Sequence, residues 1–431
     1  MTHLCDEFDP NATEIDHGIA RVIERAQALR SNQTLPPEAV TVQAALGRVL
    51  AAPVHAKLDV PMTDISAMDG FGLPASEDTP ETRLQYRTVG TAAAGRPFTG
   101  RIRPGEAVRI LTGAVIPHGV DRVVVEEVVE HDGDQLFAPL PKAGDNIRRA
   151  GEDTHTGQVL FDAGTRVTPL TIGVLASQGI TSVNVVPILK VGIVSTGDEV
   201  VESGKPLSLG QLYDSNRQLL TALLSREPVE CVDFGIVPDN AETIERTLTR
   251  ASESCHLVIA TGGASFGDFD FVNRLLAERG EVTFWKLAFK PGRPFACGRF
   301  GRAMFFGLPG NPVAVATTYS LLVRPALDVF AGTAPRQPRG VHARLAAATS
   351  KRAGRTDYQR AILERDDSVA VDDPIRFKVT TITGQGSHQL HAMAVANAYA
   401  ILPRMSEGLA EGEVVEVIPF DELGLTYGGP L

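Results

Sequence analysis

A glycine-rich stretch, Leu257 to Asp270, is the part of the sequence best suited to bind an anion. Its first four residues are apolar and predict a buried strand, which Thr261 and two glycines end at once. Phe269 to Arg279 then has the spacing of an amphipathic helix. Between a strand and a helix N-terminus, backbone N–H groups and the helix dipole favour an anion. The same pattern also fits an ordinary turn without a ligand.

Cationic side chains follow the next predicted strand. Lys286, Lys290 and Arg293 lie within the segment Trp285 to Pro294. Fixed cations suit a phosphate-bearing ligand, although a solvated basic loop would carry the same residues. Their position beside the glycine-rich loop favours phosphate binding.

Carboxylates occur in comparable loops, at Asp198, Glu199, Asp214, Asp239, Asp268 and Asp270. Asp239 could simply cap a helix, and Asp268 and Asp270 could be acids of a helix first turn. Carboxylates beside a phosphate site have a second use, because Mg²⁺ bridges the two kinds of anion. Two further acidic loops, around Asp69 and Asp153, lie in a β-rich region, where Asp69-Gly70 is also a normal turn signal.

A serine hydrolase is the sharpest competing interpretation. Gly263 to Gly267 matches G-x-S-x-G after a strand, which would make Ser265 a nucleophile with His388 or His391 as its base. The pentapeptide is short, and both histidines lie in what reads as another domain. The sequence has no GxGxxG after a strand and no GxxxxGK[ST], so the common dinucleotide and Walker sites are unsupported.

The elements that must position these residues alternate between strand and helix from Leu189 to Phe330, which predicts a doubly wound, mostly parallel sheet. Ligands of such sheets bind at the carboxyl ends of the strands. We therefore expect one crevice formed by the loops Ser195–Glu199, Thr261–Asp270 and Gly307–Pro312. The expected strands are Leu189–Ser195, Val229–Val237, Leu257–Ala260, Val282–Leu287 and Ala303–Phe306. The expected helices are Arg217–Arg226, Ala241–Ser252, Phe269–Arg279 and Val313–Phe330.

The remaining chain predicts three further domains. Helices are expected at Thr13–Leu29, with Thr13 and Asp16 as a capping-box variant, at Thr41–Leu50 and at Leu170–Gln178. The region after Pro53 is β-rich, with strands at Tyr86–Val89, Ala107–Leu111 and Arg122–Val129. The predicted domains are 13–56 with 154–187 (helical and mixed), 57–153 (an inserted β-rich domain), 188–332 (α/β) and 339–431 (β-barrel-like).

Composition bounds the partners. The formal net charge of −11 argues against nonspecific nucleic-acid binding and against an anionic membrane surface. No apolar run approaches the roughly 20 residues that span a bilayer, and the N-terminal residues lack a signal-peptide core. The four cysteines show no zinc spacing. We expect a cytoplasmic protein with reduced thiols, binding neither nucleic acid nor membrane.

Taken in order, the motifs resemble the molybdopterin molybdenumtransferase family, which includes MoeA and the gephyrin E domain. Each motif is weak alone, but the ordered set is specific and extends over almost the whole chain. The matching segments are Ser66–Phe71, Ile110–Ala114, Asn146–Asp153, Ser195–Glu199, Tyr213–Asn216, Thr261–Ser265, Trp285–Pro294, Gly307–Pro312, Gly354–Tyr358 with Arg360, and Gly384–His388.

The resemblance implies a four-domain homodimer that inserts molybdate into the dithiolene of adenylylated molybdopterin, with Mg²⁺, and releases AMP. It implies that Glu199, Asp239 and Asp270 hold Mg²⁺, and that Asp69 and Asp153 position molybdate or water. The active cleft would lie between the α/β domain of one subunit and the inserted domain of the other. The implied catalytic residues are Asp69, Thr112, Asp153, Glu199, Asp239 and Asp270. The implied cofactor-binding residues are Thr261, Gly262, Gly263, Ser265, Lys286, Lys290, Arg293, Pro309, Asn311 and Pro312.

Three positions depart from the family's usual residues. Ile65 stands where asparagine is usual, Phe71 where tyrosine is commoner, and Arg293 where lysine is frequent. The first two remove polar groups near the expected molybdate end, so the sequence leaves the choice between molybdate and tungstate open. A scaffold that binds molybdopterin or partner proteins without turnover is the second interpretation, and the hydrolase is the third. The implied protein partners are a molybdopterin adenylyltransferase and the molybdoenzymes that accept the cofactor.

Overall fold

The computed structural model describes residues 9, 11–33, 35–77, 83–262, 280–370 and 372–426. The chain divides into two compact units. Unit 1 contains Met1–Glu38, Gly47–Val49 and Val186–Leu431, and unit 2 contains Ala39–Leu46 and Leu50–Val185.

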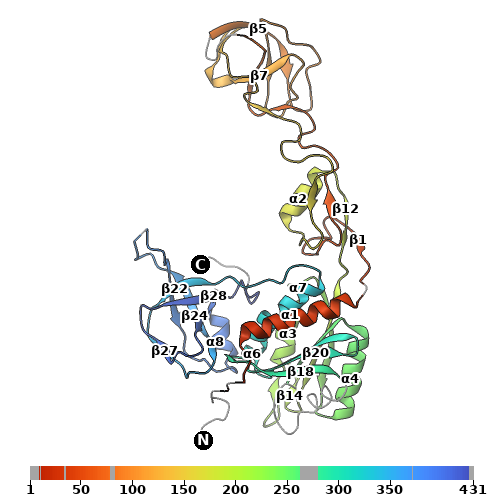
Figure 1. Cartoon of the computed structure of the whole chain (residues 1–431), viewed down its shortest axis with the longest axis vertical. Coiled ribbons are helices and arrows are strands. Elements are labelled where there is room, and N and C mark those ends of the chain that lie inside the picture. The colour runs from red at the N-terminus through yellow and green to blue at the C-terminus, as the bar shows by residue number, and fades with distance from the viewer. Residues whose placement is uncertain are drawn as a thin grey trace. The chain divides into compact units, whose positions relative to one another are not determined.

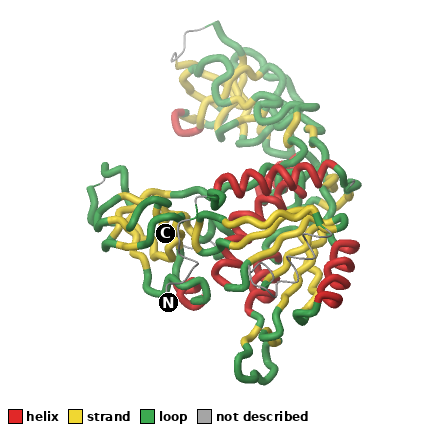
Figure 2. Tube along the Cα trace, turned by 60° about the horizontal axis from the view of Figure 1, so that its bottom comes forward, coloured by secondary structure: helices red, strands yellow, loops and turns green. Residues whose placement is uncertain are grey.

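A six-stranded sheet forms the centre of unit 1 (Figure 2). Four neighbouring strands are parallel, whereas β20 runs antiparallel to both β21 and β18. Strand β18 therefore points the same way as β21 and ends at the same edge. In sheet order the strands are β16 (Val229–Val237), β13 (Leu189–Thr196), β17 (Leu257–Thr261), β21 (Ala303–Leu308), β20 (Pro294–Phe300) and β18 (Glu281–Lys286). The mostly parallel sheet and all five predicted strands are confirmed. Strand β20 escaped prediction because proline and glycine are poor strand formers.

Helices cover both faces of this sheet. Side chains of β13 alternate between two cores, with Ile193 in one and Val194 in the other. The first core is covered by α1, α3, α6 and α7, the second by α4, and Figure 1 shows α1 lying along α7. The helices are α1 (Ile15–Ser31), α3 (Ser215–Leu224), α4 (Ala241–Ser254), α6 (Pro312–Thr318) and α7 (Arg324–Phe330).

The stretch Pro312–Phe330 is a core helix. A single π-helical turn, Tyr319–Val323, joins α6 to α7 just before Pro325, which cannot donate a backbone hydrogen bond. Within the described chain this is the one helical stretch long and apolar enough to cross a membrane, and 94% of its apolar window is buried inside the protein.

Two local predictions at the N-terminus are wrong. Glu14, not Thr13, is the N-cap of α1, and its side chain accepts no capping hydrogen bond. Instead of a helix at Thr41–Leu50, strand β1 (Glu38–Thr41) leads into turns that end at Gly47, whose φ is +77°. The backbone N–H of Val42 donates to a carbonyl near β12, so tertiary pairing overrides the helical spacing.

Helix α1 shares its core with the α/β sheet, whereas its sequence predicts a domain shared with residues 154–187. The predicted domain boundaries themselves stay predictions.

A closed barrel forms the C-terminal part of unit 1, as predicted. Five strands pair in a ring because β26 bonds both β28 and β24. A sixth strand, β19, comes from the cationic segment after β18 and pairs in parallel with β24. The elements are β19 (Phe289–Lys290), β22 (Val341–Leu345), β23 (Thr349–Ser350), β24 (Thr356–Arg365), β25 (Phe377–Thr381), α8 (Leu390–Val395), β26 (Ala398–Leu402), β27 (Gly408–Leu409) and β28 (Val414–Pro419).

Unit 2 is built mainly of short strands. The short β-rich runs between turns in residues 57–153 predict this for most of the unit. Its largest sheet has the order β7-β4-β6-β5-β9-β8, and only the β5–β6 pair in it is parallel. Helix α2 (Pro169–Ser177) begins at a capping box formed by Thr168 and Thr171. The strands are β2 (Val54–His55), β3 (Ile65–Ser66), β4 (Gly70–Pro74), β5 (Arg83–Ala92), β6 (Glu106–Ile110), β7 (Val120–Val125), β8 (Glu130–Asp132), β9 (Gln135–Pro139), β10 (Ile147–Arg148), β11 (Val159–Phe161) and β12 (Ser182–Val185).

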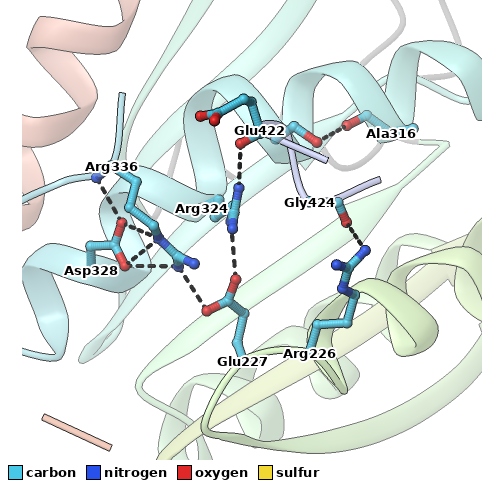
Figure 3. A network of polar contacts seen from close by, with 9 residues as sticks. Arg226, Glu227, Ala316, Arg324, Asp328, Arg336, Glu422 and Gly424 are labelled. Carbon is cyan, nitrogen blue, oxygen red and sulfur yellow. Dashed lines mark hydrogen bonds and ion pairs between the residues drawn. The ribbon is translucent and has the colours of Figure 1, made fainter. Parts of the chain in front are cut away.

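A buried ion-pair network joins the α/β sheet to the segments on either side of the barrel (Figure 3). The Glu227 side chain is 5% exposed and accepts from Arg324 Nε at 3.0 Å and from an Arg336 terminal nitrogen at 2.7 Å. Arg336 also pairs with the fully buried Asp328. Arg324 donates in turn to the carbonyl oxygen of Glu422 at 2.8 Å. The network therefore anchors both the linker into the barrel and the chain beyond it.

We expect Glu227→Ala to lower the free energy of unfolding by about 3 kcal/mol, because the largely buried Arg324 guanidinium loses the carboxylate it pairs with, while Arg336 keeps only Asp328. Burial alone would raise the pKa of Glu227, but Arg336 and Arg324 outweigh it and lower that pKa. The stabilisation is therefore complete above the ordinary carboxyl pKa and is lost as pH falls through the lowered one. Urea unfolding at pH 7 and at acidic pH measures both effects.

The matched control is Glu230→Ala. Its side chain is 53% exposed and pairs with Lys190 at 3.5 Å, so its loss should cost less than about 1 kcal/mol. Equal effects of the two substitutions would show that the buried network does not stabilise the fold.

Candidate active site

Three loops meet at the carboxyl edge of the α/β sheet. Ser195 at the end of β13 lies opposite Thr261, which lies opposite Leu308 of β21. The Thr196 hydroxyl donates to the Thr261 carbonyl oxygen at 3.2 Å. Gly262 has a φ of +96°, and a Cβ there would lie 2.4 Å from the Thr196 carbonyl oxygen, so the position requires glycine. In the described part of the loops, the predicted convergence is confirmed.

The loop after β21 is also held by the N-terminus of α3. Asn216 donates from Nδ2 to the Gly310 carbonyl oxygen at 2.7 Å, and Gly310 packs against Gly262. Within the residues that the structure describes, the buried Asn216 Oδ1 atom has no hydrogen-bond partner. Asp214 has a structural role, because its carboxylate caps α3 and pairs with Arg217 at 3.1 Å.

The loop after β13 and the loop after β16 bring carboxylates close together. The backbone N–H of Asp239 donates to Asp198 Oδ1 at 3.1 Å. Burial, followed by the negative charges of Asp198 and Glu199, raises the pKa of Asp239. Mutual repulsion of this kind is what a bound divalent cation relieves. The described residues nevertheless contain no group of three or more His, Cys, Asp or Glu side chains arranged to hold a metal ion.

The segment Trp285–Pro294 places its three predicted cations in different local surroundings. Lys286 ends β18 at the carboxyl edge of the sheet, and Lys290 lies in β19 against the barrel. A terminal nitrogen of Arg293 pairs with Asp9 Oδ2 at 3.2 Å. Binding of one phosphate group by all three side chains stays a prediction.

A cation-rich cavity of about 500 Å³ lies where this segment meets the barrel. Lys290 comes from β19, and three further cations come from the start of the barrel. The cavity is lined by Lys290, Ala348, Thr349, Ser350, Lys351, Arg352, Arg355, Asp357, Gln359, Thr381, Ile382 and Gln385. Such a concentration of positive charge in a chain of net charge −11 indicates an anion site.

One of these cations is structural. Lys351 Nζ donates to the carbonyl oxygens of Arg352, Arg404 and Ser406 at 3.2, 3.2 and 2.8 Å. Burial lowers the pKa of Lys351, Asp357 opposes that effect, and the charges of Arg355 and Lys290 add to it. Lys351 therefore holds two loops together beneath the cavity.

The cavity is connected to the carboxyl-edge loops. The backbone N–H of Val313, at the start of α6, donates to the Ser387 carbonyl oxygen at 3.1 Å. Two residues earlier in the same loop, Gln385 lines the cavity and accepts from the backbone N–H of Arg360 at 2.9 Å. The buried Arg360 guanidinium bonds the Gly384 carbonyl oxygen. The loop thus connects the carboxyl-edge loops to the cavity.

In unit 2, two of the predicted residues form a direct pair. Asp69 Oδ1 accepts from the backbone N–H of Thr112 at 2.7 Å and from its hydroxyl at 2.8 Å. These two hydrogen bonds, the backbone one first, lower the pKa of Asp69. Asp153 is exposed and its backbone N–H donates to Val60. Within the described residues no hydrogen bond or ion pair joins Asp153 to Asp69.

Two of the positions that depart from the family pattern also lie in unit 2. Phe71 is buried and packs against His131 at a ring separation of 5.0 Å, so it belongs to the core of the sheet. Ile65 is partly exposed and lies in β3, paired with Arg148.

Known proteins match the chain along most of its length. Residues 16–179 match the MoeA N-terminal region (domains I and II), 192–329 a probable molybdopterin binding domain, and 342–420 the MoeA C-terminal region (domain IV). Molybdopterin molybdenumtransferase of Haemophilus influenzae is 38% identical over 389 residues, covering 90% of this chain and 94% of that protein. The chain belongs to the molybdopterin molybdenumtransferase family. This family consists of transferases, as predicted.

Further relatives agree with this assignment. The molybdopterin molybdenumtransferase of Bacillus subtilis is 31% identical over 391 residues, which cover 88% of this chain and 89% of that protein. The crystal structure of the molybdopterin biosynthesis moeA protein from Pyrococcus horikoshii is 27% identical, has a TM-score of 0.77, and covers 95% of this chain and 100% of that one.

Several residues implied for a molybdopterin molybdenumtransferase remain predictions. Gly263, Ser265 and Asp270, with the predicted helix Phe269–Arg279, lie outside the described residues. Described neighbours at the carboxyl edge are Thr261, Gly262, Pro309, Asn311 and Pro312. The sequence reasoning missed Lys351, Arg352, Arg355 and Asp357 as cavity residues. Their sequence signal is that Lys351, Arg352 and Arg355 lie within five positions of one another in an acidic chain, which is a candidate anion site.

We expect Thr112→Ala to raise the pKa of Asp69 part of the way to its ordinary value. The substitution removes the hydroxyl donor and keeps the backbone N–H, which has the larger effect. The carbon resonance of the Asp69 carboxyl, followed by NMR through an acid titration, measures the change.

Thr156→Ala is the matched control, because Thr156 donates to Asp59 in the same way, at 2.7 and 2.8 Å. It should raise the pKa of Asp59 and leave that of Asp69 unchanged. If Thr112→Ala also left the pKa of Asp69 unchanged, the pairing of Asp69 with the Thr112 hydroxyl would be wrong.

Proposed function

We propose that this chain inserts molybdate into the dithiolene of adenylylated molybdopterin and releases AMP in a Mg²⁺-dependent reaction. The cation-rich cavity beside the carboxyl edge of the sheet is the observation that carries the proposal. Its cations suit a small oxyanion, whereas the neighbouring crevice suits a larger phosphate ester. The relatives that match most of the chain are named molybdopterin molybdenumtransferases.

The oxyanion occupies the cavity in this proposal. Molybdate is a dianion, and Lys290, Arg352 and Arg355 contribute fixed positive charge to the cavity wall. Guanidinium groups match the oxygens of a tetrahedral oxyanion well, because each presents several N–H donors in a fixed plane. Tungstate has the same charge and shape, so the choice between the two is a matter for measurement.

The adenylylated pterin occupies the carboxyl-edge crevice. Ligands of doubly wound sheets bind there, and the required glycine at Gly262 lets a ligand approach the backbone. The adjoining carboxylates fit a divalent cation in part: Glu199 and Asp239 lie close enough to repel, and Asp270 would supply the third ligand. When bound, Mg²⁺ would neutralise charge on the phosphates. Cleavage of the phosphoanhydride then depends on positioning and on stabilising the leaving phosphate.

The direct test is to incubate the full chain with adenylylated molybdopterin and Mg²⁺, with and without molybdate, and to measure AMP and cofactor. Molybdate-dependent formation of both is expected. Tight pterin binding without turnover would favour a scaffold instead. If Ser265→Ala abolished activity and Asp270→Ala did not, the serine hydrolase would be favoured.

We expect Arg355→Ala to raise the KM for molybdate by roughly 10-fold or more, since a charge-assisted hydrogen bond contributes about 1.5–3 kcal/mol. The KM for the pterin substrate should change little, because that ligand binds in the crevice. Arg365→Ala is the control, since that side chain is 63% exposed and outside the cavity lining. An unchanged KM for molybdate in Arg355→Ala would place the oxyanion elsewhere.

We further propose that the chain forms a homodimer in which unit 2 of one subunit completes the site of the other. Asp69→Asn and Asp239→Asn should each be inactive alone. Refolded or co-expressed together, they should regain about one quarter of wild-type activity, because half of the dimers are mixed and each mixed dimer has one intact site. If the two variants were shown to exchange subunits and their mixture still regained no activity, the proposal that two subunits share each active site would be wrong. The adenylyltransferase and molybdoenzyme partners and a cytoplasmic location stay predictions.

A further inference from the structure

A carboxylate lies within the cation-rich cavity. Asp357 is 7% exposed and is the one acidic residue among the described residues that line the cavity. Its position is fixed by the fold, because β19 and β24 pair with Lys290 opposite Asp357. A negative charge at this place opposes the binding of any anion, so a cavity that served only to bind molybdate would be better without it.

The neighbouring side chains hold this carboxylate in a defined orientation. The Thr349 hydroxyl donates to Gln359 Oε1 at 2.8 Å, which fixes the amide so that Nε2 points to Asp357. That Nε2 donates to Asp357 Oδ2 at 3.3 Å. Within the described chain the other oxygen, Oδ1, accepts no hydrogen bond. Asp357 therefore keeps one carboxylate oxygen available to a ligand in the cavity.

The other lining residues cannot accept a proton at neutral pH. Arginine and lysine side chains in their charged forms are donors without an acceptor, and hydroxyl and amide groups are not bases. Lys351 donates all its N–H groups to carbonyl oxygens. Among the described lining residues, Asp357 is thus the group able to take up and release a proton beside a bound oxyanion.

The proposed reaction requires such a proton transfer. A thiol must lose its proton to become a good nucleophile, and an oxo ligand leaves readily only when protonated. For molybdate and a dithiol the balanced step is MoO₄²⁻ + R(SH)₂ → [MoO₃(S₂R)]²⁻ + H₂O. Two Mo–S bonds form, one Mo–O bond breaks, both thiol protons end on the departing water, and no atom is oxidised or reduced.

We propose that Asp357 is the catalytic residue that carries protons from the dithiolene sulfurs to the leaving oxygen of molybdate. The inference rests on the proposed function and on molybdate binding in the cavity. The cations hold the oxyanion, and the carboxylate moves the protons that the cations cannot.

The test separates binding from turnover with Asp357→Asn, which keeps the shape of the side chain and removes its charge. Molybdate affinity, measured by equilibrium dialysis of the full chain, should rise several-fold because a like charge is gone. Cofactor formation at saturating molybdate should slow by about 100-fold or more. Asp357→Glu should recover part of the rate. Asp367→Asn, whose side chain is 86% exposed, should change neither quantity.

Each other result overturns the proposal. An unchanged rate in Asp357→Asn would show that no proton passes through this carboxylate. Weaker molybdate binding together with a slow rate would show that Asp357 only shapes the cavity. If the wild-type chain forms no cofactor, the proposed function fails and this inference fails with it. An active wild type with an equally active Asp357→Asn overturns this inference alone.

Discussion

The short parallel pairing of β19 with β24 is the interaction on which the cation-rich cavity depends. It takes Lys290 out of the loop that follows the α/β sheet and places it on the barrel, beside residues that are more than sixty positions away in sequence. The cavity exists only while these two folds stay docked. The buried Glu227 network fixes them at the linker and at the chain beyond the barrel, and Arg360 bonds the loop between the cavity and α6. The fold thus gathers cations locally in a chain whose overall charge is negative.

The sequence predicted the regular parts of this fold well. Apolar runs that alternate with amphipathic helices predicted five of the six strands of the α/β sheet correctly. They are recognisable because strands buried on both faces are continuously apolar. Prediction failed where long-range pairing decides the conformation. The segment Thr41–Leu50 has helical spacing, yet Val42 bonds to a carbonyl near β12 and Gly47 adopts a left-handed turn. Strand β20 begins with proline and contains glycine, and its place between β21 and β18 was not readable from local pattern.

The candidate site was only partly predictable for the same reason. Strand order brought Ser195, Thr261 and Leu308 to one edge, as the alternation predicted. Local spacing favoured phosphate binding by Lys286, Lys290 and Arg293, which stays a prediction. It did not show that Lys290 lies against the barrel or that Arg293 pairs with Asp9. The cations that join Lys290 belong to a distant domain, and no periodicity connects them. The contact between Asp69 and Thr112 likewise depends on how turns of unit 2 pack.

The central claim is that the oxyanion binds in the cavity between β19 and the barrel. An anomalous difference map at the molybdenum K edge, from crystals of the full chain grown with molybdate, tests it most directly. A strong peak within hydrogen-bond distance of Arg355 and near Asp357 is expected. A peak beside Asp69 or Asp153, with none in the cavity, would contradict it.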